Sequence, residues 1–200
     1  IGPNAALLVG HGQVREMIMG KEQREPTPEE LKKMKDLVRA AMEQGAYGIS
    51  TGLEYIPGSY SKTDEVIELV SIVRPYGGIY HTHIRNEGES GDLIKAVEEA
   101  VEIAKKTGVP THISHIKASH KPNWGLSGKV CEIIEEAQRK NLTITADQYP
   151  FRFGGNSPYK AFIPRSAWIG GESQAGLQLS DIDFIFDELT ESELIELYKK

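Results

Sequence analysis

Short apolar segments alternate with longer amphipathic segments along the first three quarters of the chain. The short segments predict five β-strands, at residues 5–9, 46–51, 78–84, 110–117 and 142–149. Strands that alternate with helices are typical of βαβ units, in which neighbouring strands run parallel. The pattern therefore predicts an α/β fold built on a parallel sheet.

Helix signals mark the longer segments. Thr27 is an N-cap candidate, Pro28 suits the first helical position, and Glu30 completes a capping box. Four helices are predicted, from residue 28 to about 45, from residue 63, from about 90 to 108, and from about 128 to 140. Crossovers of this length are right-handed by default, and repeated crossovers in one direction close into a barrel.

The pattern changes after Pro150. Residues 151–171 have the Gly, Pro and aromatic composition of loops, and residues 189–200 predict one amphipathic helix. A complete (β/α)₈ barrel takes about 250 residues, with around 200 as the floor. We therefore expect an incomplete TIM barrel at residues 1–171, followed by a divergent segment at 172–200 that ends in the amphipathic helix.

Two predicted strands carry histidines near their carboxyl ends, where parallel α/β folds place functional residues. Alternation puts His81, His83 and Arg85 on one face, and it sets His112 on the opposite face from His115. Neutral imidazole is a good zinc ligand, although a lone strand histidine is usually only a hydrogen-bonded polar residue. Spacing alone leaves both interpretations of His83 and His115 open.

Composition narrows the function classes. The 200 residues include 23 Lys and Arg and 29 Asp and Glu, for a net charge of -6, and no basic cluster favours nucleic acid. No apolar run approaches the roughly 20 residues that cross a bilayer, and no export signal is recognised, so we expect no membrane partner and a cytoplasmic location. The single cysteine, Cys131, cannot form an internal disulfide and is expected to pack as a core thiol.

Five segments together resemble a known family. They are GHGQVR at residues 10–15, GAYGISTGLEYIPG at 45–58, YHTHIRNE at 80–87, ISHIK at 113–117 and DQYP at 147–150. Their order and spacing are similar to those of N-acyl-D-amino-acid deacylases, metal-dependent TIM barrels of the amidohydrolase superfamily. The similarity covers roughly residues 3–171 and implies that the chain contains about strands 3 to 7 of the barrel.

The resemblance implies a Zn²⁺ site. By it, His83 and His115 are the zinc ligands of the fifth and sixth barrel strands, and His81 is a supporting neighbour rather than a ligand. Arg85 and Glu87 are implied to orient ligands or substrate, with a surface ion pair between them as the alternative.

The resemblance also implies substrate contacts. Lys117 and Tyr149 correspond to the residues that hold the substrate carboxylate, to which an ammonium offers charge and a phenol a directional donor. Tyr55 is expected to line the pocket for the amino-acid side chain. The neighbouring Glu54 is unusual for a pocket that takes apolar side chains.

The implied activity is hydrolysis of the amide bond of small-molecule N-acyl-D-amino acids. The first-strand His-x-His pair, the upstream cysteine ligand and the eighth-strand Asp acid/base of the family have no counterpart in this sequence. No catalytic residue is therefore assigned, and we expect the isolated chain to be inactive and to self-associate through unpaired barrel edges. The alternatives are a segment of a hydantoinase-like cyclic amidase and a non-catalytic, barrel-derived binding module.

Overall fold

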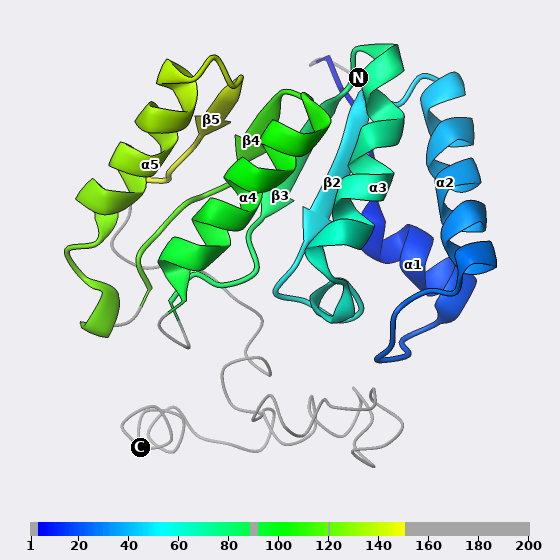
Figure 1. The fold of residues 1–200 in the computed structure, drawn as a ribbon, viewed down its shortest axis with the longest axis horizontal. Helices are drawn as coiled ribbons and strands as arrows, with labels where there is room; N and C mark the ends of the chain where they lie inside the picture. The colour runs from blue at the N-terminus through cyan, green and yellow to red at the C-terminus, as the bar shows by residue number, and fades with distance from the viewer. Residues whose placement is uncertain (1–3, 89–91, 120, 151–200) are drawn as a thin grey trace. The chain divides into compact units, whose positions relative to one another are not determined.

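The computed structural model describes residues 4–88, 92–119 and 121–150, which form alternating strands and helices (Figure 1). The strands are β1 (Leu8–Gly10), β2 (Gly48–Gly52), β3 (Ile79–His83), β4 (Thr111–Ile113) and β5 (Ile144–Ala146). The helices are α1 (His11–Met19), α2 (Pro28–Glu43), α3 (Thr63–Val73), α4 (Leu93–Thr107) and α5 (Ser127–Arg139). Short 3₁₀ turns lie at Gly58–Tyr60, Arg74–Tyr76 and Lys121–Asn123.

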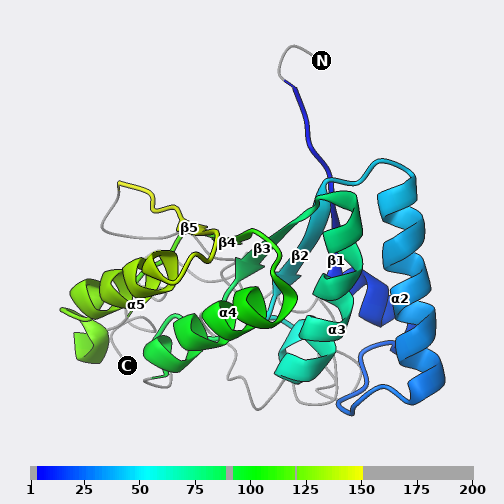
Figure 2. The same ribbon diagram turned by 45° about the horizontal axis from the view of Figure 1, so that its top comes forward.

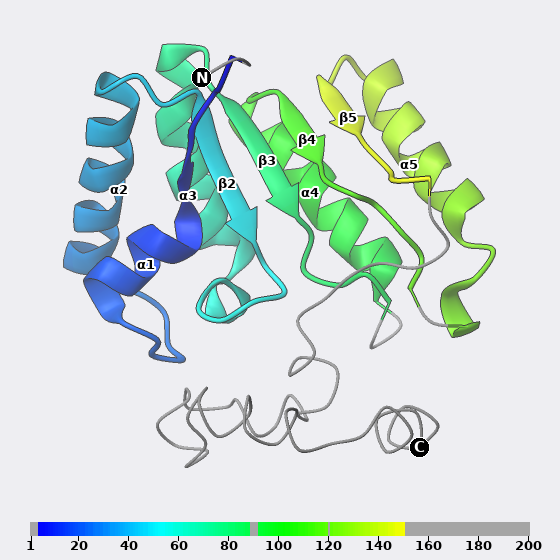
Figure 3. The same cartoon turned by 180° about the vertical axis from the view of Figure 1, so that it is seen from behind.

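The five strands form one parallel sheet in the order β1-β2-β3-β4-β5, so every connection leads to the neighbouring strand. Helices α2 to α5 line one face of this sheet, and the strands lie in front of them when the structure is seen from behind (Figures 2 and 3). This succession of neighbouring parallel strands is that of a barrel segment, as the sequence predicted. Among the described helices, none is long and apolar enough to cross a membrane.

The helix-facing side chains of the strands form the core. Ile49, Tyr80, Ile113 and Ile144 are almost fully buried, and each lies on a different strand. The register that pairs Gly48 with Ile79 brings the two backbones very close, and a Cβ at Gly48 would overlap the carbonyl oxygen of Ile79. Only glycine fits at that position.

The start of α2 confirms the predicted capping box. The Thr27 hydroxyl accepts from the Glu30 backbone N–H at 3.3 Å, and the Glu30 carboxylate accepts from the Thr27 backbone N–H at 2.8 Å. Pro28 occupies the first helical position, where its missing N–H costs nothing.

Two expectations were wrong, and one helix was missed. Residues 110–117 do not form one strand, because β4 ends at Ile113. His11 begins α1, a helix that the sequence analysis did not predict. Cys131 is exposed rather than packed in the core, because α5 turns Val130 and Ala137 inward instead. The predicted domain boundary at 171 and the predicted helix at 189–200 lie outside the described residues.

Candidate metal centre

His83 and His115 meet at the carboxyl ends of neighbouring strands. His83 is the last residue of β3, and its Nδ1 lies 2.9 Å from His115 Nε2. The two rings meet edge to face, with centroids 4.6 Å apart. The side chains are 11% and 36% exposed, so the pair opens toward solvent on the His115 side.

His115 reaches this position through a backbone turn rather than through strand alternation. Its φ of 38° lies in the left-handed region, and the Asp147 carboxylate accepts a hydrogen bond from its backbone N–H. The turn corrects the alternation argument. His112 lies on the face of His81, with their rings stacked 5.1 Å apart and 9° from parallel, and His115 departs from that pattern.

Two carboxylates hold the outer nitrogens of the histidine pair. Glu54 Oε2 lies 2.5 Å from His83 Nε2, and Glu87 Oε1 lies 3.0 Å from His115 Nδ1. The Glu87 side chain is only 9% exposed. A carboxylate on the far nitrogen fixes the tautomer of a metal-binding imidazole and increases its basicity. The inner nitrogens, His83 Nδ1 and His115 Nε2, are thereby left to share an ion.

The donor set fits zinc. Nitrogens bound about 2.0 Å from a tetrahedral zinc ion lie about 3.3 Å from each other, close to the 2.9 Å that separates the inner nitrogens here. His83, Glu87 and His115 each offer a ligand atom, and these atoms all lie within 4.8 Å of one another. Glu87 could therefore either orient His115 or bind the ion itself.

The expected substrate residues surround this pair. Lys117 Nζ lies 3.0 Å from His115 Nδ1, contacts the Glu87 carboxylate and sits 5.7 Å from the centre of the Tyr149 ring. Burial, followed by the nearby charge of Glu87, raises the pKa of Tyr149 above its ordinary value, so the phenol keeps its proton as a donor. The Tyr55 ring lies 4.7 Å from that of His83.

The remaining two expected site residues have other partners. Arg85 donates to Glu99 of α4 from Nε at 2.9 Å and from Nη2 at 2.8 Å, so it ties the end of β3 to a helix. The His81 Nε2 lies 3.3 Å from the Ser114 hydroxyl, and burial, followed by the neighbouring His112, lowers the pKa of His81.

A cavity of about 480 Å³ adjoins the histidine pair. His81, His83 and His115 line it together with Tyr55, and residues 10–13, Glu16 and residues 56–58 form another part of its lining. It has the size of a small-molecule site.

The segment that spans residues 10–16 rests on a buried ion-pair cluster that the sequence analysis missed. Glu65 of α3 accepts from His11 Nε2 at 2.9 Å and from the Arg15 guanidinium, and both partners are fully buried. Burial alone would raise the pKa of Glu65. The hydrogen bonds from His11 and Arg15 together lower it by more than burial raises it, so the pKa lies below its ordinary value. Arg15 and Glu65 are 50 positions apart in the sequence, and no sequence pattern indicated this contact.

Comparison with known proteins shows which proteins the chain is similar to. No protein-family model matches it. A D-aminoacylase from Alcaligenes xylosoxydans xylosoxydans is 41% identical over 151 residues, which are 76% of this chain and 31% of that protein. An N-acyl-D-glutamate deacylase from the same organism is 34% identical, over 74% of this chain and 30% of that protein.

Solved structures agree. A D-aminoacylase described as defining a novel subset of amidohydrolases superposes with a TM-score of 0.70 at 38% identity, over 74% of this chain and 31% of that one. An N-acyl-D-glutamate deacylase from Bordetella bronchiseptica, complexed with zinc and a phosphonate inhibitor, also gives 0.70, at 36% identity and the same coverage. The chain spans about a third of the length of these relatives, and it belongs to the N-acyl-D-amino-acid deacylase family of amidohydrolases, as a segment of the family's barrel.

Proposed function

We propose that the chain is a segment of a zinc-dependent amidohydrolase that cleaves the amide bond of N-acyl-D-amino acids, releasing a D-amino acid and a carboxylate. The observation that carries the proposal is the 2.9 Å approach of His83 Nδ1 to His115 Nε2 at the strand ends, beside a cavity of small-molecule size. Relatives named as D-aminoacylase and N-acyl-D-glutamate deacylase supply the reaction class.

His83 and His115 would hold the zinc ion. When bound, zinc polarises an amide carbonyl and lowers the pKa of a water molecule. Glu54 and Glu87 keep the two imidazoles in the orientation that presents their inner nitrogens, because each carboxylate occupies an outer nitrogen.

Lys117 and Tyr149 would bind the carboxylate of the acylated amino acid. The Lys117 ammonium supplies charge and the Tyr149 hydroxyl a directed donor, and the two side chains already lie against each other. Glu87 holds the ammonium close to His115, which sets the distance between the carboxylate and the reacting amide. Tyr55, on the cavity wall, would contact the amino-acid side chain.

The test is a deacylation assay on the full-length gene product, with N-acetyl-D-amino acids and their L-isomers, in added zinc and after chelation. We expect turnover of D-substrates only, lost on chelation and in His83→Gln and His115→Gln. Lys117→Met should raise KM at least tenfold, whereas Lys35→Met, which removes an exposed pair with Glu68, should leave it unchanged.

Three outcomes would overturn the proposal. Hydrolysis of hydantoins without that of N-acyl-D-amino acids would favour the cyclic amidase. Binding without turnover of either class would favour the binding module. Full activity of His83→Gln would remove the proposed centre. A cytoplasmic location and a small molecule as the sole partner are also part of the proposal, and cell fractionation tests the location.

A further inference from the structure

A polar layer runs across the sheet on the face away from helices α2 to α5. The strand register places Ser50, His81, His112 and Thr145 beside one another on β2 to β5. Inward-facing layers of such barrels are normally filled by bulky branched aliphatic side chains. Four adjacent polar residues cannot fill that role, so this layer is better suited to holding a polar ligand than to packing.

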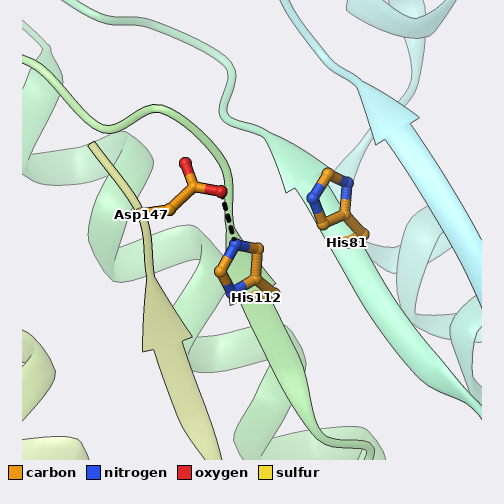
Figure 4. Close-up of side chains that lie close together, drawn as sticks. All are labelled: His81, His112 and Asp147. Atoms are coloured by element: carbon orange, nitrogen blue, oxygen red, sulfur yellow. Dashed lines mark hydrogen bonds and ion pairs between the residues drawn. The ribbon is translucent and has the colours of Figure 1, made fainter. Parts of the chain in front are cut away.

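Two histidines of this layer converge with a carboxylate (Figure 4). His81 and His112 stack face to face, and Asp147, which follows β5, places Oδ2 2.9 Å from His112 Nε2. The three side chains each offer one ligand atom, and those atoms all lie within 4.8 Å of one another. Small rotations about the side-chain bonds would bring them to the roughly 3.3 Å spacing of ligands on a tetrahedral ion.

Hydroxyl groups orient both imidazoles. Thr145 Oγ1 lies 2.8 Å from His112 Nδ1, which leaves His112 Nε2 directed at Asp147. Ser114 Oγ lies 3.3 Å from His81 Nε2. Partners on the far side of metal-binding histidines are a regular feature of protein metal sites.

The charge state of the cluster also suits a cation. An ordinary aspartate carboxylate is ionised at neutral pH, so Asp147 supplies a negative charge beside the two imidazoles. Two imidazoles and one carboxylate are a ligand set used for first-row transition metals, with the remaining positions open to water.

We propose that His81, His112 and Asp147 form a binding site for a divalent first-row transition metal, separate from the His83–His115 centre. The two sites share no ligand residue. The proposed site also differs from the rest of the family's metal centre. By the resemblance, that centre is completed by a first-strand His-x-His pair and an eighth-strand Asp, and none of these is His81, His112 or Asp147. Asp147 accepts from the backbone N–H of His115, so an ion bound here would stiffen the turn that carries a residue of the other centre.

The experiment counts metal ions. The purified full-length protein is stripped with a chelator, loaded with Co²⁺ and separated from free metal, and its cobalt content and visible absorption are measured. His112→Gln and Asp147→Asn should each bind one equivalent fewer than the unsubstituted protein. Both side chains are partly exposed, at 27% and 57%, so neither substitution opens the core, and circular dichroism verifies the fold.

Two further variants complete the design. Asp64→Asn, at an 89% exposed position, is the matched control and should keep every equivalent. His83→Gln should lose the equivalent of cobalt that binds at the His83–His115 centre, which His112→Gln retains. The double variant should therefore bind two equivalents fewer than the unsubstituted protein. An unchanged cobalt content in His112→Gln and Asp147→Asn overturns this site whether or not the protein deacylates its substrates. Absence of deacylation activity would not change the number of cobalt equivalents bound, so the two proposals are tested separately.

Discussion

Glu54 brings a carboxylate to His83, a proposed zinc ligand, from a loop that was expected only to border a substrate pocket. Its Oε2 lies 2.5 Å from His83 Nε2. The sequence marked Glu54 as unusual because a charge does not suit an apolar pocket, and the structure supplies a reason for it. Which side chain of a loop turns toward a neighbouring strand depends on the path of the loop, and hydrophobic periodicity does not encode that path.

The role of Glu54 leads to a prediction about zinc affinity. Glu54→Gln keeps the shape of the side chain but removes the charge, so His83 becomes a weaker ligand, and the affinity should fall about 10- to 100-fold. Competition with a chromophoric chelator measures this. Glu68→Gln, at an exposed pair with Lys35, is the control. Equal affinities in the two variants would show that Glu54 does not support the metal.

At the scale of elements, a buried carboxylate joins α1 to α3. Glu65→Gln leaves the fully buried Arg15 guanidinium without its countercharge, which typically costs about 3–5 kcal/mol of the free energy of unfolding. Urea unfolding followed by circular dichroism checks the loss, and Glu68→Gln should stay within about 0.5 kcal/mol of the parent. A similarly small effect of Glu65→Gln would contradict the assigned ion pair.

The start of α2 predicts a dependence of stability on pH. Hydrogen bonds from Arg24 and then from the Thr27 backbone lower the pKa of Glu30 to about 2 from 4.5. A folded-state pKa below the unfolded one stabilises the protein at pH above about 4.5, and that contribution disappears as the pH falls toward 2.

Comparison with Glu30→Gln isolates this contribution. The parent should have the higher urea midpoint near pH 6, and the gap between parent and variant should close as the pH is lowered through 4.5 toward 2. A gap that is constant over this range would show that the Glu30 charge is not involved.

Hydrophobic periodicity and helix-capping residues were enough to predict most of the strands and helices. The five strands and helices α2 to α5 were found because each has an apolar stripe or a start and stop signal, such as Thr27-Pro28 or Gly108. Helix α1 was missed because His11 and Arg15 occupy its buried face, where an apolar residue would have signalled a helix. β4 was overextended because nothing in the sequence announces a left-handed backbone at His115.

At the scale of the whole molecule, the described sheet has two outer strands, β1 and β5. Outer strands offer unpaired backbone groups to other chains. We predict that the isolated 200-residue polypeptide associates, so that its mass by light scattering rises with concentration. The mass of a single chain at every concentration tested would contradict this, and the full-length gene product serves as the comparison.

The placement of the candidate site shows what family resemblance adds to geometry. Alternation grouped His81 with His83 on β3, but it treated His115 as part of the strand that contains His112, whereas β4 ends at Ile113 and His112 stacks on His81. The strand-end positions made His83 and His115 joint candidates, and the resemblance assigned them as the zinc ligands. The structure brings their rings together by a turn that regular strand geometry does not contain.

The left-handed backbone of His115 has a consequence for how folding and zinc are linked. A side chain with a Cβ is disfavoured at φ 38°, at a cost of order 1 kcal/mol that glycine does not bear. His115→Gly should therefore unfold no more easily than the parent in metal-free urea, whereas His83→Gly, in an extended strand, should unfold more easily. Added zinc should raise the parent's midpoint by mass action and leave that of His115→Gly unchanged. The imidazole at position 115 would then destabilise the metal-free protein and stabilise only the zinc-bound protein. The zinc concentration would therefore set the fraction of chains that stay folded.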